Sequence, residues 1–154
     1  MRSTLTSRRL SLVIAGLVVF VDQLTKRWAL AALNGGQVVV IPGLLAFELN
    51  TNTGAAFGFL RGGGTLLGIA AIVAVAVILH MTTETVRPLE HVALGLILGG
   101  AIGNLIDRIV RGDGFLDGAV VDWIQLPNFP TFNVADSAIT VGAFLLILGA
   151  LRRP

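Results

Sequence analysis

Two aspartates, Asp122 and Asp136, are the residues whose chemistry most needs an explanation. Neither has a basic residue three or four positions away with which it could form a helical ion pair. Two aspartates held a few ångströms apart cannot both ionise cheaply, so they share one proton near neutral pH. One carboxylate can then take a proton from water while the other donates a proton to a carbonyl oxygen. The pair therefore predicts peptide hydrolysis without a metal or a covalent intermediate.

Other catalytic side chains are scarce in this chain. It has no cysteine, which excludes disulfides, thiol catalysis and thiolate metal sites. His80 and His91 flank a short turn about 30 Å from the polar residues by helical rise, and we expect both to be plain interfacial residues. With neither histidine within reach of these residues, a serine triad and a zinc site are excluded, and Ser137 is expected only to pack. We expect no metal and no cofactor.

A second set of polar residues interrupts long apolar stretches, where a charge in hydrocarbon costs at least a few kcal/mol. At ~1.5 Å per helical residue they fall at one depth, in the outer part of a ~30 Å hydrocarbon core. They either support a site or only pair with one another to hold the helices together, Asp22 with Lys26 and Asp107 with Arg108. The sets that share a helix face are Asp22 with Lys26, Asn104 with Asp107 and Arg108, and Asn133 with Asp136.

The composition indicates a protein of the lipid bilayer. Hydrophobic residues make up 55% of the 154 residues and charged residues only 13%. Each of four apolar blocks approaches the ~20 residues that a helix needs to cross hydrocarbon. We therefore predict an all-α integral membrane protein with a single membrane-embedded domain over 1–154. Its four transmembrane helices are expected at about 10–33, 65–81, 90–110 and 134–151.

The first block has a second interpretation as a cleavable signal peptide, because Arg8 and Arg9 precede a short apolar stretch. Asp22, Lys26 and Arg27 argue against it, since they place three charges where a cleavage region is normally small and neutral. We expect the first helix to be retained.

The arginines beside the apolar runs predict the orientation. Arg8, Arg9, Arg152 and Arg153 lie next to helix ends, so the positive-inside rule places both termini in the cytoplasm. Segments 34–64 and 111–133 are then extracytoplasmic. Residues 38–41 and 44–49 are β-favouring runs separated by Pro-Gly, which predicts a small extracytoplasmic β-sheet lying on the membrane.

Glycines carry a separate prediction. Gly95, Gly99 and Gly103 recur every four residues on one helix face, a pattern that lets transmembrane backbones approach closely. Gly54, after Asn52, either lets a substrate backbone come near or serves a simple turn.

Three classes of function remain open on these residues. A membrane peptidase uses the aspartate pair, a small proton-coupled transporter also uses membrane carboxylates, and a scaffold uses none. A transporter should show paired helix breaks at mid-membrane, and a scaffold gives no reason for Asp122 and Asp136. The net charge of +2 is too small to indicate a nucleic-acid partner.

Five motifs in order resemble the signature blocks of the lipoprotein signal peptidases (signal peptidase II). Together they span residues 22–137, and five in sequence are far more specific than any one. The blocks are Asp22-Gln-Leu-Thr-Lys26, Asn52-Thr-Gly54-Ala-Ala-Phe-Gly58, the run from Gly99 to Arg108, Val120-Val-Asp122-Trp123 and Phe132-Asn133-Val-Ala-Asp136-Ser137.

The resemblance implies an integral membrane aspartyl endopeptidase that removes the signal peptides of bacterial prolipoproteins. Cleavage would fall just before a cysteine that already carries diacylglycerol. The partners would be these substrates and membrane lipids, and we expect a monomer in the cytoplasmic (inner) membrane with its site near the extracytoplasmic face. A short helix over the site is expected within 34–64. The catalytic pair maps onto Asp122 and Asp136, and supporting polar residues map onto Asp22, Asn52, Asn104, Arg108 and Asn133, with Lys26 and Gly54 in the same motifs.

The chain departs from the family pattern in two places. The stretch 109–121 is long for the family and contains Asp117, which raises the question of whether this carboxylate approaches the site. Trp123 stands where phenylalanine is commoner, which we interpret as a conservative change of an interfacial aromatic residue.

Overall fold

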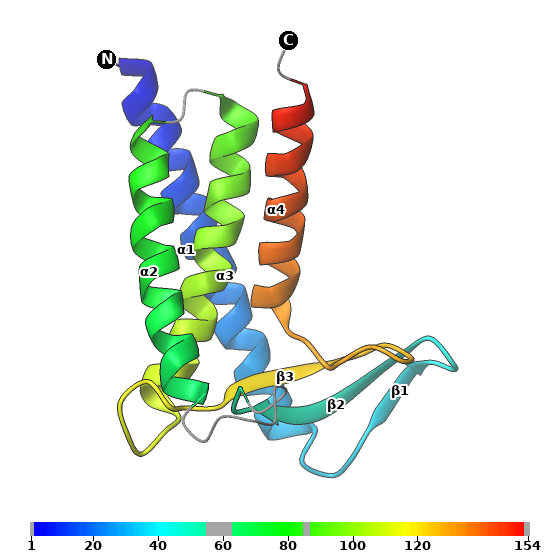
Figure 1. The fold of residues 1–154 in the computed structure, drawn as a ribbon. Helices are drawn as coiled ribbons and strands as arrows, with labels where there is room; N and C mark the ends of the chain where they lie inside the picture. Colours follow the sequence, from blue (N-terminus) through cyan, green and yellow to red (C-terminus); the bar gives the residue numbers. More distant parts are fainter. Residues whose placement is uncertain (1, 55–62, 85–86, 153–154) are drawn as a thin grey trace.

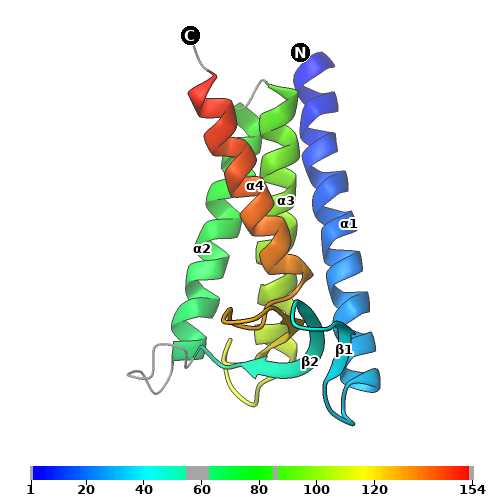
Figure 2. The same ribbon diagram turned by 90° about the vertical axis from the view of Figure 1, so that its right-hand side faces the viewer.

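Four long helices form an upright bundle with a small sheet at one end (Figure 1). The computed structural model describes residues 2–54, 63–84 and 87–152. The helices are α1 (Arg2–Ala32), α2 (Gly63–Glu84), α3 (Pro88–Val110) and α4 (Val134–Leu151). Both termini lie at the end of the bundle opposite the sheet in both ribbon views (Figures 1 and 2).

Within the described residues, three helices are long and apolar enough to cross a membrane, namely α2 from Gly64, α3 and α4. The apolar stretch of α1 is interrupted by Asp22, Lys26 and Arg27. Length and composition therefore support three of the four predicted spans, and a crossing by α1 stays a prediction.

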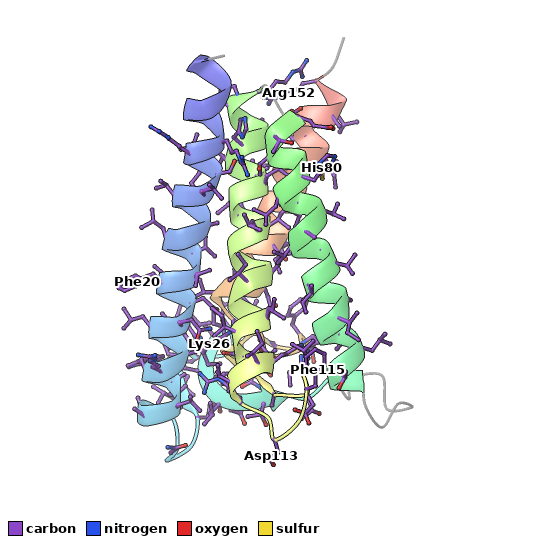
Figure 3. The ribbon with its side chains drawn as sticks, turned by 90° about the vertical axis from the view of Figure 1, so that its left-hand side faces the viewer. Phe20, Lys26, His80, Asp113, Phe115 and Arg152 are labelled. Carbon is purple, nitrogen blue, oxygen red and sulfur yellow. The ribbon has the colours of Figure 1, made fainter. Side chains whose placement is uncertain are left out.

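Large apolar side chains point outward from the bundle, as a lipid environment requires. Leu17 and Phe20 of α1 are 60% and 65% exposed, and Phe144 of α4 is 63% exposed. Figure 3 shows Phe20 directed away from the other helices. Water would disfavour such a surface at roughly 25 cal/mol per Å², whereas hydrocarbon does not.

Among the three apolar helices α2, α3 and α4, helix α3 is the most buried. It contacts all three other helices of the bundle, α1 included. The predicted glycine stripe explains one of these contacts, because Gly95 lies against Ser11 and Ile14 of α1, and Gly99 against Ala15 and Val18. On another face Gly100 lies against Ala135 of α4, and Gly142 of α4 lies against Ala93 of α3. The packing prediction for the glycines is confirmed.

The sheet has three antiparallel strands in the order β1-β2-β3. Strands β1 (Val38–Ile41) and β2 (Leu45–Asn52) are the two β-favouring runs expected from the sequence. The third strand, β3 (Val120–Gln125), was not predicted, and it pairs with β2 so that Asn50 lies opposite Asp122. Of the expected short helix, residues 34–54 contain none, and 55–62 lie outside the described residues.

The prediction for His91 is wrong. This side chain of α3 is fully buried, and the Ser11 hydroxyl of α1 lies 2.9 Å from its Nδ1 and donates to the His91 carbonyl oxygen at 2.9 Å. His91 therefore helps to join two helices. His80 is exposed and lies 3.4 Å from Glu84 on α2, as an interfacial residue can.

Candidate functional site

The two aspartates of interest come from different elements and meet at Asn133. Asp122 lies in β3, and Asp136 lies in the first turn of α4. The Asn133 amide donates to Asp122 Oδ1 at 2.7 Å, and its carbonyl oxygen accepts from the Asp136 backbone N–H at 2.9 Å. Asp136 Oδ2 accepts from the Asn133 backbone N–H at 3.2 Å. Asn133 therefore joins β3 to α4 at the predicted pair.

These bonds also explain why α4 begins where it does. Asn133 is the N-cap residue and Asp136 occupies the third helical position, so the two form a reciprocal capping box. The carboxylate of Asp136 thus satisfies a backbone donor that a helix start would otherwise leave unpaired. Its position is held by the helix start itself.

A second amide reaches the pair from α3. Asn104 Nδ2 donates to Asp136 Oδ1 at 2.8 Å, and Asn104 Oδ1 accepts from Asn133 Nδ2 at 3.2 Å. Each aspartate therefore receives a hydrogen bond from an asparagine side chain, and the two asparagines contact each other. The structure places Asn104 and Asn133 in contact with the two aspartates, and their supporting roles stay a prediction.

Lys26 of α1 contacts Asn104 and is fully buried, as are Asp22 and Asp107. Its ammonium is 2.9 Å from Asp22 Oδ2 and 2.9 Å from Asp107 Oδ2. The expected Asp22–Lys26 pair is thus present. The expected Asp107–Arg108 pair is wrong: among the described residues Asp107 pairs with Lys26 and with Arg111, whose Nε is 3.0 Å from Oδ1. Adjacent helical residues point in different directions, which favours Arg111 one turn later.

Arg108 is directed at the chain that leads into β3. Its Nη1 donates to the Gly118 carbonyl oxygen at 3.4 Å, and the Gly118 backbone N–H donates to the Arg108 carbonyl oxygen at 3.1 Å. Asp117 accepts from the Gly114 backbone N–H at 3.0 Å, within its own loop. This loop also contacts α2, because the Thr65 hydroxyl donates to the Phe115 carbonyl oxygen at 3.0 Å.

The pKa of Asp122 is raised to about 6, first by burial and second by the negative charge of Asp136. Hydrogen bonds from Asn133 and Asn52 and the charge of Lys26 act in the opposite direction. Asp122 is only 3% exposed, whereas Asp136 is partly exposed. A carboxyl group that still holds its proton near pH 6 is suited to donate one.

Asn52 and Gly54 lie at the end of β2, beside the pair. Asn52 is opposite Val120 in the sheet register, and its side-chain oxygen accepts from the Gly54 backbone N–H at 2.9 Å. That bond leaves the Asn52 amide as the donor toward Asp122. Gly54 has φ of +83°, a conformation that other residues rarely adopt.

One polar residue of this site was not predicted. Gln23 Nε2 donates to Asp22 Oδ2 at 3.2 Å, to the Gly103 carbonyl oxygen at 3.0 Å and to Asp107 Oδ1 at 3.2 Å. Helical spacing from Asp22 and Lys26 does not select a residue adjacent to Asp22, although Gln23 stands in the same sequence motif.

Trp123 is buried rather than interfacial. It forms edge-to-face contacts with Trp28 of α1 at 5.3 Å and with Phe47 of β2 at 5.0 Å between ring centroids. These rings attach the sheet to α1 on the side of β3 away from Asp122, because neighbouring strand residues point to opposite faces.

A cavity of about 680 Å³ opens between the β1–β2 hairpin and residues 125–130. Neither Asp122 nor Asp136 lines it. No cluster of three His, Cys, Asp or Glu side chains that could hold a metal ion occurs within the described ranges.

The chain matches a protein-family model described as signal peptidase (SPase) II over residues 14–152. It belongs to the signal peptidase II family. The motif resemblance found in the sequence is thereby confirmed, and the chain is a peptidase that resides in a bacterial membrane.

Curated relatives agree with the signal peptidase II assignment. The chain is 46% identical to a lipoprotein signal peptidase of Symbiobacterium thermophilum, covering 90% of this chain and 92% of that protein. It is 47% identical to one from Pseudomonas putida, covering 88% and 83%. A solved bacterial membrane enzyme has a similar fold, with a TM-score of 0.83, 34% identity and 94% of each chain covered. Membership of this family favours a peptidase over a transporter or a scaffold.

Proposed function

We propose that this protein is an aspartic endopeptidase that removes the signal peptides of bacterial prolipoproteins, with Asp122 and Asp136 as its catalytic pair. Cleavage falls just before the diacylglyceryl-modified cysteine. The observation that carries the proposal is the Asn133 side chain, which donates to Asp122 and accepts from Asp136 within one capping box. The Asn133 side-chain amide thereby holds the Asp122 carboxylate, and the Asn133 backbone N–H holds the Asp136 carboxylate, so one residue joins the two acids.

The reaction follows from the different surroundings of the two acids. Asp136 is partly exposed, so water can reach it, and as a carboxylate it takes a proton from the attacking water. Asp122 is buried with a pKa of about 6, and in its protonated form it donates to the carbonyl oxygen of the scissile bond. A tetrahedral diol forms. Asp136 then gives its proton to the amide nitrogen while Asp122 takes one from a diol hydroxyl, so the C–N bond breaks, the two peptide products leave and both aspartates regain their starting protonation. No metal or covalent intermediate is required.

The position of the aspartate pair suits a peptide substrate that carries a lipid. Asp136 lies at the first turn of α4, where an apolar helix meets the sheet. We place this end at the extracytoplasmic face of the inner membrane, with both termini cytoplasmic and α1 as the fourth span. The acyl chains of the substrate then stay in lipid beside the helices while the scissile bond lies at the wet boundary. We expect a monomer in contact with membrane lipids.

The test uses purified protein in detergent with a matched pair of preprolipoproteins, one lipidated by diacylglycerol and one unmodified. We expect cleavage of the lipidated form only, with a new N-terminus at the modified cysteine. Activity should persist with strong chelators, because the pair needs no metal. Cleavage of both forms at equal rates, or loss with a chelator that zinc restores, would contradict the proposal.

A further inference from the structure

We propose that Lys26 is the positioning residue that sets the geometry of the aspartate pair. This inference rests on the proposed function of Asp122 and Asp136. The Lys26 ammonium lies at the sheet end of α1, fully buried, and has three acceptors at 2.9 Å (Figure 3). Each of the three acceptors leads by one further hydrogen bond to an aspartate of the pair or to the residue before it.

The first connection runs through Asp22 to α4. Asp22 Oδ2 is 2.9 Å from the Lys26 ammonium, and Asp22 Oδ1 accepts from the Ala135 backbone N–H at 3.0 Å. Ala135 is fully buried and directly precedes Asp136. Its N–H is one of the donors that a helix start leaves without an intrahelical partner. Asp22 therefore fixes the backbone that carries Asp136.

The second connection runs through Asp107 to β3. Asp107 Oδ2 is 2.9 Å from the Lys26 ammonium and accepts from the Val121 backbone N–H at 3.1 Å. Val121 is 1% exposed and directly precedes Asp122. The same lysine therefore holds, through two carboxylates, the backbone before each catalytic aspartate.

The third connection runs through a side-chain amide. Lys26 donates to Asn104 Oδ1 at 2.9 Å, and an ammonium has no acceptor to offer. This contact fixes which end of the Asn104 amide faces Lys26. The Nδ2 group is left to donate to Asp136 Oδ1 at 2.8 Å. Without the ammonium, the amide could reverse and place its oxygen against the carboxylate.

Charge explains why this residue must be a cation. Asp22 and Asp107 are both fully buried, and the ammonium lies between them with all three of its donors used. A buried carboxylate without its partner is strongly unfavourable, so loss of Lys26 would move both carboxylates and the backbone N–H groups they accept from. A displacement of ~1 Å at a reacting group can cost about 100-fold in rate.

The first experiment replaces the lysine and then restores an ammonium. For Lys26→Ala in detergent with a lipidated substrate, we expect kcat to fall about 100-fold and KM to change less than about threefold. n-Propylammonium matches the missing atoms, so it should restore kcat saturably, whereas n-propanol should not. Wild-type kcat in Lys26→Ala, a change confined to KM, or equal rescue by propanol would overturn the proposal.

A second pair of variants tests the connection to β3 and decides the case if Lys26→Ala does not fold. Asp107→Asn removes the carboxylate between Lys26 and Val121, whereas the matched control Arg111→Gln removes only the outer partner of Asp107, which is 3.0 Å away. We expect kcat to fall about 100-fold for the first and to stay near wild type for the second. Equal effects would overturn the role of Lys26.

The proposed function has a separate criterion in the same assay. If wild-type protein cleaves and Asp122→Asn also cleaves, the aspartate pair is wrong whatever Lys26→Ala does. Propylammonium should leave Asp122→Asn inactive, because restoring the geometry cannot restore a missing acid.

Discussion

At the scale of single residues, Asp122 and Asp136 differ from the other buried carboxylates. Asp22 and Asp107 each lie 2.9 Å from a lysine ammonium, whereas the carboxylates of Asp122 and Asp136 accept from asparagine amides and a backbone N–H of the described residues. Amides hold a carboxyl group in place without removing its ability to carry a proton. The two classes of aspartate are thus suited to structure and to proton transfer respectively.

Replacing either member of the pair by asparagine should abolish cleavage. Asp122→Asn and Asp136→Asn keep the size of the side chain but lose proton transfer, so we expect turnover to fall by at least about 1,000-fold in each. Because the two act as one unit, the double variant should be no slower than the singles. Cleavage is followed by gel shift, and thermal melting checks that each variant is folded. Substantial turnover by either single variant would contradict the assignment.

The raised pKa of Asp122 predicts a dependence of stability on pH. The folded protein binds this proton up to about pH 6, whereas the unfolded chain releases it near 3.8. The stabilising effect of that proton is complete below 3.8 and is lost as the pH rises through 6. An asparagine at position 122 stays neutral at every pH, so the variant does not lose this stabilisation. Asp122→Asn should therefore melt at a higher temperature than wild type at pH 7.5.

The difference in melting temperature should shrink as the pH falls from 7.5 to 4, where wild-type Asp122 is largely protonated. Melting curves at four or five pH values measure it. Asp22→Asn provides a contrast, because that change removes one of the two carboxylates that pair with Lys26 and should lower the melting temperature. A difference for Asp122→Asn that is constant with pH would refute the linkage.

At the scale of elements, the glycine face of α3 determines how closely α1 can approach. A Cβ at Gly99 would lie 2.6 Å from the Val18 Cβ and 2.7 Å from the Ala15 carbonyl oxygen. Both are rigid parts of α1, so the helices would have to separate. Asp22 lies on α1 one to two turns beyond, against Gly103. The packing of this glycine face therefore also affects the positions of the polar residues of the site.

Gly99→Ala should destabilise the protein by roughly 1–3 kcal/mol, the usual cost of overpacking. Gly16→Ala is the matched control, because its Cβ would meet nothing within 4 Å. In a helix that change is expected to be neutral or stabilising by up to about 1 kcal/mol. Denaturation in mixed micelles measures both. If the two variants unfold alike, close packing at Gly99 is not what holds α1 to α3.

The sequence predicted elements with strong local signals and missed those that depend on distant partners. The four apolar blocks and the first two strands are local patterns. Strand β3 is short, has an aspartate at its centre and becomes a strand by pairing with β2, about 70 residues earlier. The Asp107–Lys26 pair was missed for a related reason, since Lys26 comes from another helix. His91 was misplaced because its hydrogen-bond partner, Ser11, lies on α1.

At the scale of the whole molecule, the sheet lies at one end of the bundle and both termini lie at the other (Figure 1). Asp113 and Phe115 lie at the sheet end, and Arg152 and His80 lie toward the other (Figure 3). The termini share the end near Arg152 (Figures 1 and 2). A protein that cleaves at the outer face must have the sheet end outside, so the orientation follows from the proposed function and from the arginines near the termini.

Cysteine labelling in intact cells or oriented vesicles tests this orientation. The chain has no cysteine, so a single Asp113→Cys or Arg152→Cys is the only thiol present. Both positions are exposed. A membrane-impermeant maleimide added outside should label Asp113→Cys, whereas Arg152→Cys should react only after the membrane is permeabilised, because a charged reagent cannot cross ~30 Å of hydrocarbon. His80→Cys, at the far end of α2, should behave like Arg152→Cys. The reverse pattern would place the aspartate pair in the cytoplasm, where exported prolipoproteins could not reach it.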